Sequence, residues 1–187
     1  MSWESIIPNV LAGDPQSLAG AAPAAIMDNE QFAAFYARSA RSLWAYLARV
    51  SRDPGLADDL TQEAYVRFLC ADHPQDGEVA ARRYLFKIAT NLLRDHWRRP
   101  QSSSIDELPE AVFAASSEIQ SDSAAMLGPA MARMRPRDRQ LLWLAYAEGY
   151  SHHEIAQITG LASASIRLLL FRARRKIARL LRSGGEA

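Results

Sequence analysis

Apolar residues recur along most of the chain at the spacing of α-helices, and no stretch shows the sustained alternation typical of a β-strand. In the first periodic stretch, Phe35, Tyr36 and Leu43 belong to a stripe that we expect to face a core. The periodic stretches predict helices over residues 28–50, 56–69, 80–98, 124–134, 136–147, 151–159 and 163–181. The fold predicted from this pattern is all-α.

Two stretches lack this helical period and divide the chain. Residues 1–27 are rich in Ala, Gly and Pro, which is typical of a flexible N-terminal extension. Residues 100–123 begin with a helix-stopping proline, Pro100, and continue with seven Ser and five acidic residues, the composition of a flexible acidic linker. We therefore predict two small helical domains, at residues 28–99 and 124–183.

Local signals place several helix ends. Asp53 followed by Pro54 is a favourable helix start, because aspartate caps the first turn and proline fits within it. Ser151 and Glu154 have the spacing of a capping box, and Gly160 stands where the short helix that they open should end. A short helix, a tight turn and a longer basic helix together describe a helix-turn-helix.

The last predicted helix has two unlike faces. Its apolar stripe should pack inward and consists of Ile166, Leu169, Leu170, Ala173, Ile177 and Leu180. The opposite side is mainly basic and contains Leu168, Phe171, Arg172, Arg175 and Arg179, with Arg167 on its flank. This arrangement is that of a recognition helix for DNA.

Charge is segregated along the chain although the net charge is only +1. Residues 82–99 contain six basic residues and one acid, and residues 133–185 contain eleven basic residues and three acids. The intervening residues 100–132 carry a net charge of −5. Two basic blocks separated by an acidic one predict two surfaces for a polyanion, and 20 of the 22 basic residues are Arg, which suits contacts with phosphate and guanine.

Several other classes of protein do not fit the sequence. A single cysteine, Cys70, excludes an internal disulfide and a Cys-rich zinc site. His152 and His153 are neighbours on a helix and point about 100° apart, so we expect no metal site there and no cofactor. No apolar run approaches the roughly 20 residues of a membrane span, and the first 30 residues have no basic start of a secretory signal. We expect a cytoplasmic protein without membrane insertion.

The C-terminal half resembles region 4 of bacterial sigma factors. The motifs that carry the resemblance are Gly149-Tyr150-Ser151, Glu154-Ile155-Ala156 and Arg172-Ala173-Arg174, downstream of Pro136 and Arg139. Taken alone, these motifs also fit other regulators that contain a helix-turn-helix.

The N-terminal half extends the resemblance to the whole architecture. Residues 57–68 resemble sigma region 2.2, and residues 84–99 resemble regions 2.3 and 2.4. The order and spacing follow the family, the match covers about 145 of the 187 residues, and domain 3 is missing. The chain thus resembles the extracytoplasmic-function (ECF) sigma factors. The resemblance implies a non-enzymatic protein that binds core RNA polymerase, promoter DNA and an anti-sigma factor.

The resemblance also implies three sets of site residues. The −35 element of the promoter would be read by Ser163, Ser165, Arg167, Leu168, Phe171, Arg172 and Arg175. The −10 element would be bound and melted by Arg83, Lys87, Asn91, Arg94, Trp97 and Arg98. Core polymerase would be bound by Asp58, Asp59, Gln62, Glu63 and Arg67.

Within the −10 set, the amide of Asn91 can both donate and accept hydrogen bonds, so it can read a base, while the cations hold phosphates. By resemblance, Asn91 would contact a base flipped out of the duplex, in a pocket walled by residues 71–78. Trp97 would either stack on DNA or pack against the protein.

The sequence departs from the family at Leu168 and Leu169, where a small polar residue and Arg are usual. Leu168 faces outward and could contact a thymine methyl group, whereas Leu169 lies on the inward stripe. Two other functions remain open. One is a DNA-binding regulator that works without polymerase. The other is a prenyl-chain synthase, because Asp58-Asp59 with Gln62-Glu63 faintly resembles the aspartate-rich metal motif of those enzymes.

Overall fold

The computed structural model describes residues 27–71, 77–98 and 122–184. In this part of the chain there are seven α-helices and no β-strand, so the predicted all-α fold is confirmed. The helices are α1 (Asn29–Ser51), α2 (Pro54–Cys70), α3 (Glu78–Arg98), α4 (Asp122–Ala132), α5 (Pro136–Tyr146), α6 (His152–Thr159) and α7 (Ser163–Gly184). The predicted N-terminal extension and acidic linker lie almost wholly outside the described residues.

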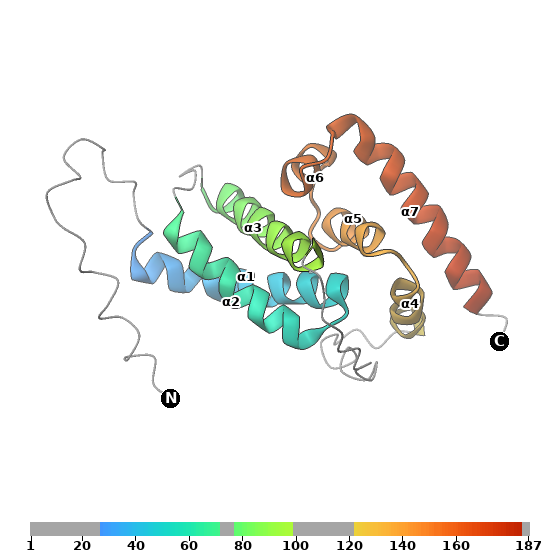
Figure 1. The fold of residues 1–187 in the computed structure, drawn as a ribbon, viewed down its shortest axis with the longest axis horizontal. Helices are drawn as coiled ribbons and strands as arrows, with labels where there is room; N and C mark the ends of the chain where they lie inside the picture. Colours follow the sequence, from blue (N-terminus) through green and yellow to red (C-terminus); the bar gives the residue numbers. More distant parts are fainter. Residues whose placement is uncertain (1–26, 72–76, 99–121, 185–187) are drawn as a thin grey trace, which may run out of the picture.

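The first three helices pack side by side as a bundle (Figure 1). Their buried faces meet in an aromatic core, where the rings of Phe35 and Phe68 stack at 5.2 Å. Asp53 caps α2 and Pro54 opens it, as predicted. The prediction that Tyr36 faces the core is wrong, because its side chain is 47% exposed and packs at the surface against the ring of Tyr65.

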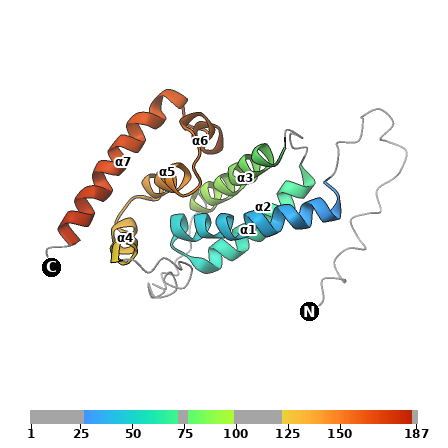
Figure 2. The same cartoon turned by 180° about the vertical axis from the view of Figure 1, so that it is seen from behind.

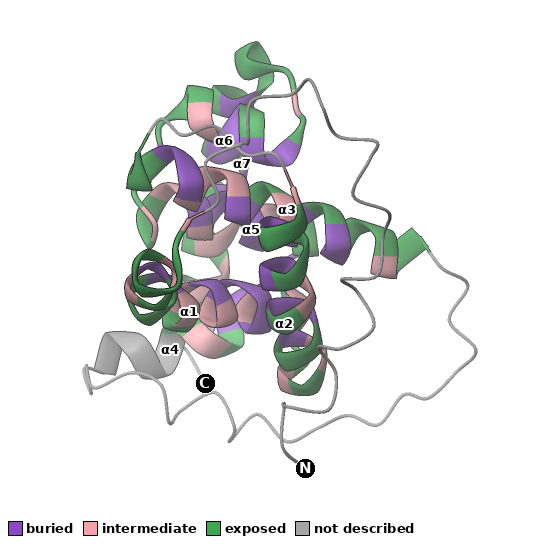
Figure 3. Ribbon diagram, turned by 90° about the vertical axis from the view of Figure 1, so that its left-hand side faces the viewer, coloured by how far each residue is buried: buried purple, intermediate pink, exposed green. Residues whose placement is uncertain are grey.

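The last three helices contain the predicted helix-turn-helix. Ser151 and Glu154 form the expected capping box, and Gly160 ends α6 in the left-handed conformation, with φ of 68°. The axes of α6 and α7 are bent by 100° at the turn, within the range of about 90–120° usual for this motif. Ile155, Ile158 and other inward side chains close the small core. Figure 3 colours the buried residues of the ribbon purple, including those of α6.

The two groups of helices are packed against each other. Helix α5 lies against α1, and α6 lies against α3 (Figures 1 and 2). The rings of Phe86 on α3 and Tyr150, which precedes α6, meet edge to face at 5.7 Å. A continuous apolar core therefore runs from the first bundle into the second.

No single helix among the described residues is long and apolar enough to cross a membrane. The bent pair of α6 and α7 passes the same test of length and composition when its two members are counted together.

The capping box of α6 gives a first testable prediction. Ser151→Ala removes the side-chain acceptor for the backbone N–H of Glu154, so we expect the free energy of unfolding to fall by about 1 kcal/mol. Urea unfolding followed by circular dichroism measures the change. Ser183→Ala, near the end of α7, is the control, and an equal loss in both variants would contradict the capping role.

Candidate nucleic-acid interface

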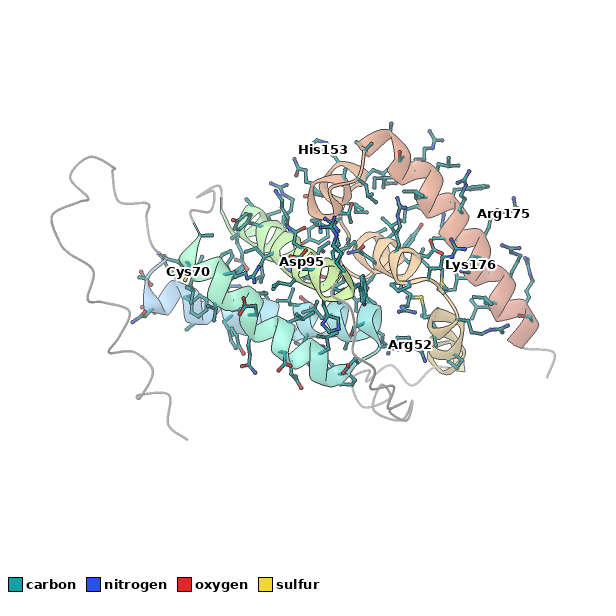
Figure 4. All side chains as sticks on the ribbon, in the orientation of Figure 1. Arg52, Cys70, Asp95, His153, Arg175 and Lys176 are labelled. Carbon is teal, nitrogen blue, oxygen red and sulfur yellow. The ribbon has the colours of Figure 1, made fainter. Side chains whose placement is uncertain are left out.

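The outer face of α7 is a cationic surface with apolar side chains in it. All seven residues predicted to read the −35 element are exposed, whereas Ile166, Leu170 and Ala173 on the opposite side are buried. The guanidinium of Arg175 lies 5.8 Å from the ring centroid of Phe171. In Figure 4, Arg175 points away from the rest of the molecule. The structure thus brings the predicted −35 residues together on one solvent-facing surface.

Two large apolar side chains lie exposed on this face. Leu168 is 50% exposed and Phe171 is 48% exposed. They are three residues apart, so they lie next to each other on the helix surface. Apolar side chains in a basic surface suit base edges that present a methyl group between phosphate-bearing strands.

The predicted −10 residues form a second stripe along α3. Lys87, Asn91 and Arg98 are exposed, and Trp97 is 40% exposed near the end of the helix. The amide oxygen of Asn91 lies 3.4 Å from a guanidinium nitrogen of Arg94, one turn along. These residues thus lie along one side of α3 with an amide among cations, while residues 72–76 of the predicted pocket wall lie outside the described residues.

Two members of this stripe are engaged by α6. Nη2 of Arg94 donates to the carbonyl oxygen of Thr159 at 2.5 Å, and Nη1 of Arg83 lies 3.4 Å from a carboxylate oxygen of Glu154. Arg83 and Lys87 also line a shallow cleft between the two helices, together with Gln157. Helix α6 thus runs along the flank of α3 that was predicted to bind DNA.

A stronger ion pair lies beside this contact. Nη2 of Arg82 donates to Oε2 of Glu148 at 2.6 Å, and the Glu148 side chain is only 3% exposed. Burial raises the pKa of Glu148, although hydrogen bonding by Trp143 and the charge of Arg82 oppose the shift. At Glu154 the pKa shifts in the opposite direction. The backbone N–H of Ser151 donates a hydrogen bond to the carboxylate, and this holds the pKa of Glu154 below its usual value.

A buried polar cluster crosses the boundary between the two groups of helices. The hydroxyls of Tyr46 on α1 and Thr90 on α3 are 2.7 Å apart, and the amide nitrogen of Gln140 on α5 donates to the Tyr46 hydroxyl at 2.6 Å. Burial raises the pKa of Tyr46 to about 12, so the phenol stays neutral. These buried polar groups satisfy one another, which makes the contact specific.

Arg139 joins the same boundary through backbone oxygens. Its guanidinium donates to the carbonyl of Val50 at 2.6 Å and to that of Met134 at 2.8 Å, and the residue is 4% exposed. Burial lowers the pKa of Arg139 to about 10, so the side chain remains charged at neutral pH. Val50 lies in the last turn of α1, where the negative end of the helix dipole stabilises a cation.

The predicted polymerase-binding residues lie on the outward side of α2. Asp59, Gln62 and Arg67 are exposed, and Arg67 pairs with Glu63, one turn away on α2, at 2.7 Å. Asp58 is also exposed, but the indole nitrogen of Trp44 donates to its carboxylate at 2.7 Å. This face of α2 is accessible and presents both acidic and basic side chains to a partner.

In the described part of the chain, no three His, Cys, Asp or Glu side chains gather as a metal site. Cys70, labelled in Figure 4, is exposed at the end of α2.

Sequence reasoning missed the residues that join the two halves. They are Arg82, Arg139, Gln140, Glu148 and Thr159, together with the second role of Glu154. One signal was present: Arg139 and Gln140 are polar residues next to the apolar run that starts at Leu141, yet both are buried. A polar residue on a buried helix side needs a partner, but the sequence does not say which one.

Comparison with protein families gives two matches in the same order. Residues 35–103 match the sequence model of sigma-70 region 2, and residues 125–177 match that of sigma-70 region 4. Among curated proteins, the ECF RNA polymerase sigma factor SigL of Mycobacterium tuberculosis is 27% identical over 173 residues, covering 85% of this chain and 90% of SigL. The ECF RNA polymerase sigma factor SigM of Bacillus subtilis is 26% identical over 147 residues, covering 76% and 90%.

Solved structures share the fold. The sigma factor RpoE of Bartonella quintana, in complex with the anti-sigma factor NepR, superposes with a TM-score of 0.66 at 19% identity, covering 82% of this chain and 98% of that one. CnrH, in complex with the cytosolic domain of CnrY, gives a TM-score of 0.59 at 23% identity, covering 86% and 93%.

Proposed function

This chain belongs to the ECF sigma factors of RNA polymerase, which are non-catalytic, promoter-recognising initiation factors, and from this premise we propose a role for each of its surfaces. The outer face of α7 reads the −35 duplex, α3 captures the melted −10 strand, and the outward side of α2 docks on core polymerase. The observation that supports this division best is the pair of separate cationic helix faces, one of them with an exposed amide among its cations.

At the −35 element, the arginines of α7 would make the contacts. Arg167 and Arg172 are exposed in the N-terminal half of α7, the part of a recognition helix that meets base edges. A guanidinium can donate bidentate hydrogen bonds to the O6 and N7 of guanine. Ser163 and Ser165 lie at the N-terminal end, where hydroxyls and backbone N–H groups bind phosphate. The short α6 would cross the DNA backbone.

At the −10 element, melting would follow from binding and needs no chemistry by this chain. A base that leaves the duplex gives up stacking and pairing worth a few kcal/mol. Stacking on an aromatic side chain such as Trp97 returns about 1–3 kcal/mol, and the amide of Asn91 can hydrogen-bond to the edge of the flipped base. Lys87 and Arg98 would hold the phosphates on either side.

Partners and location follow from the family as proposals. The chain would work in the cytoplasm, where core polymerase and promoter DNA are found, and would carry no catalytic activity of its own. An anti-sigma factor would hold it inactive, in line with the anti-sigma proteins bound to the structural relatives RpoE and CnrH.

Reconstitution with core RNA polymerase tests the proposal. We expect a stable complex and transcripts with discrete starts, and mapping the starts across a genome would give the −10 and −35 sequences. A chain that binds duplex DNA but not core polymerase would instead be an ordinary helix-turn-helix regulator. Magnesium-dependent turnover of prenyl diphosphates would indicate the synthase.

Leu168 gives a prediction on base preference. Because its exposed side chain can pack on a thymine methyl group, replacing one thymine of the mapped −35 element by deoxyuridine should weaken binding by about 0.8 kcal/mol, or roughly 4-fold. Titrations of labelled duplexes with the polymerase complex measure this loss. Leu168→Ser should bind both duplexes equally, and a wild-type protein that is insensitive to every such replacement would exclude methyl reading.

A further inference from the structure

We propose that Trp44 is a positioning residue for core polymerase, because its indole holds the carboxylate of Asp58 in place on the polymerase-binding face of α2. The inference rests on the proposed function, since it deepens the role of that face. It adds a residue of α1, outside the predicted polymerase-binding set, to the groups that determine how tightly the chain docks.

The contact between the two side chains fixes one oxygen of the carboxylate. Nε1 of Trp44 on α1 donates to Oδ1 of Asp58 on α2 at 2.7 Å, across the seam between two helices that lie side by side (Figure 1). An indole has a single N–H, whereas a carboxylate can accept several hydrogen bonds on its two oxygens. The bond to Trp44 therefore leaves Oδ2 of Asp58 available to a donor of the partner.

The donor itself is held by the core of the bundle. The ring of Trp44 is partly buried and packs against the apolar core that α1 and α2 share. A tryptophan side chain has only two rotatable bonds, so a packed ring carries its N–H at a nearly fixed point. The carboxylate of Asp58 is thereby tied to the body of the bundle and not only to its own helix.

The other acidic residues of the predicted set are held differently. Glu63 pairs with Arg67 one turn along the same helix, and both side chains are about half exposed. Such surface pairs are weak and hold their geometry loosely. Asp59 is exposed at the position next to Asp58. Within the described residues, Asp58 is thus the acid of this set whose hydrogen bond reaches another helix.

This hydrogen bond contributes more to docking than to the fold. Asp58 is exposed, so water can replace the indole as its partner when the bond is lost. The pairing of α1 with α2 depends instead on buried contacts such as the stacked rings of Phe35 and Phe68. A side chain that loses its rotamer freedom on docking lowers the affinity by about 3- to 10-fold. Because Trp44 already holds the carboxylate in the free chain, docking avoids this loss.

Trp44→Phe tests the inference in the full chain, because phenylalanine keeps an aromatic ring against the core but has no N–H. We expect its affinity for core RNA polymerase to be about 3- to 10-fold lower than that of the wild type. Titration of chain labelled at its N-terminus with core polymerase, followed by fluorescence anisotropy, measures the affinity.

Repeating the substitution without the carboxylate separates a positioning role from a structural one. In an Asp58→Ala background the indole has nothing to hold, so Trp44→Phe should cause no further loss of affinity. A loss of packing would lower the affinity equally in both backgrounds. The difference between the two losses should also shrink at high salt, because the contact that the carboxylate makes is ionic.

Trp143→Phe is the matched control. The indole of Trp143 also donates to a carboxylate, that of Glu148 at 2.9 Å, but this pair lies on α5 and the segment that follows it. Any effect of Trp143→Phe on polymerase affinity should therefore be the same with and without Asp58.

The outcomes separate this inference from the proposed function. If Asp58→Ala weakens polymerase binding but Trp44→Phe does not, the positioning role is overturned and the initiation role stands. Equal losses from Trp44→Phe in both backgrounds would overturn it as well, since they would show a structural role. Unchanged affinity in Asp58→Ala would remove the carboxylate, and with it Trp44, from docking. A wild-type chain that does not bind core polymerase would instead overturn the proposed function itself, together with this inference.

Discussion

Arg172→Ala is expected to weaken binding to the −35 duplex by about 1–3 kcal/mol, the cost of losing one two-pronged contact with a base. The same loss is expected for Arg167→Ala. Both side chains are exposed on the outer face of α7 and have no acidic partner among the described ion pairs, so their removal should leave the fold unchanged. Titration of full-length chain, bound to core polymerase, into labelled duplexes of the mapped −35 sequence and of scrambled sequence measures both affinity and specificity.

Arg174→Ala is the matched control for this prediction. Arg174 is also an exposed arginine of α7, but it donates to the hydroxyl of Tyr146 on α5 at 3.1 Å and so lies toward the protein. It should lose little specific affinity. A base-reading arginine should also relax the preference at one base pair, whereas a phosphate contact weakens all sequences alike and lowers the salt dependence. Equal affinity in Arg172→Ala and wild type would remove this residue from the site.

Most of the fold could be predicted because its signals are local. Helix ends were marked by residues that act within one turn, such as the capping pair Ser151 and Glu154, and the inward stripes followed from helical spacing alone. Tyr36 shows the limit of that reasoning. It has the spacing of a core residue, but its ring lies at the edge of the contact between α1 and α2, against Tyr65, and is left 47% exposed.

The solvent-facing sides of the helices in the site could also be predicted, because a residue on the polar side of an amphipathic helix points away from the core. What could not be predicted is which outward face meets another part of the chain. Arg82, Arg83 and Arg94 look equivalent to Lys87 in sequence, yet three of the four contact the second half. Such contacts join residues that are about 65 or more positions apart, and no local rule specifies them.

The positive charges of α3 and α7 are therefore not equally available to DNA. The arginines of α7 are exposed, whereas Arg82 and Arg83 of α3 are partly neutralised by Glu148 and Glu154. The isolated chain should therefore meet DNA first through α7, whose positive surface speeds association.

Asn91→Ala is expected to reduce open-complex formation by about 10- to 100-fold while leaving association with core polymerase intact. The reason is that the amide is the one neutral group in the α3 stripe that can both donate and accept, so its loss removes the hydrogen bonds to a captured base, worth about 1–3 kcal/mol. Permanganate reactivity of unpaired thymines in the −10 element measures melting, and gel filtration measures association.

Lys87→Ala provides the contrast that identifies a base contact. Lys87 lies one turn before Asn91 on the same exposed stripe, but an ammonium group holds phosphate without regard to sequence. Its loss should weaken capture of every −10 sequence equally and reduce the dependence on salt. Asn91→Ala should instead flatten the preference for one −10 base, so that promoters mutated at that base melt as well as the original. If both variants lowered melting alike across all sequences, the amide would be a further backbone contact, and base reading on α3 would have to lie with Trp97 or with the residues that precede the helix.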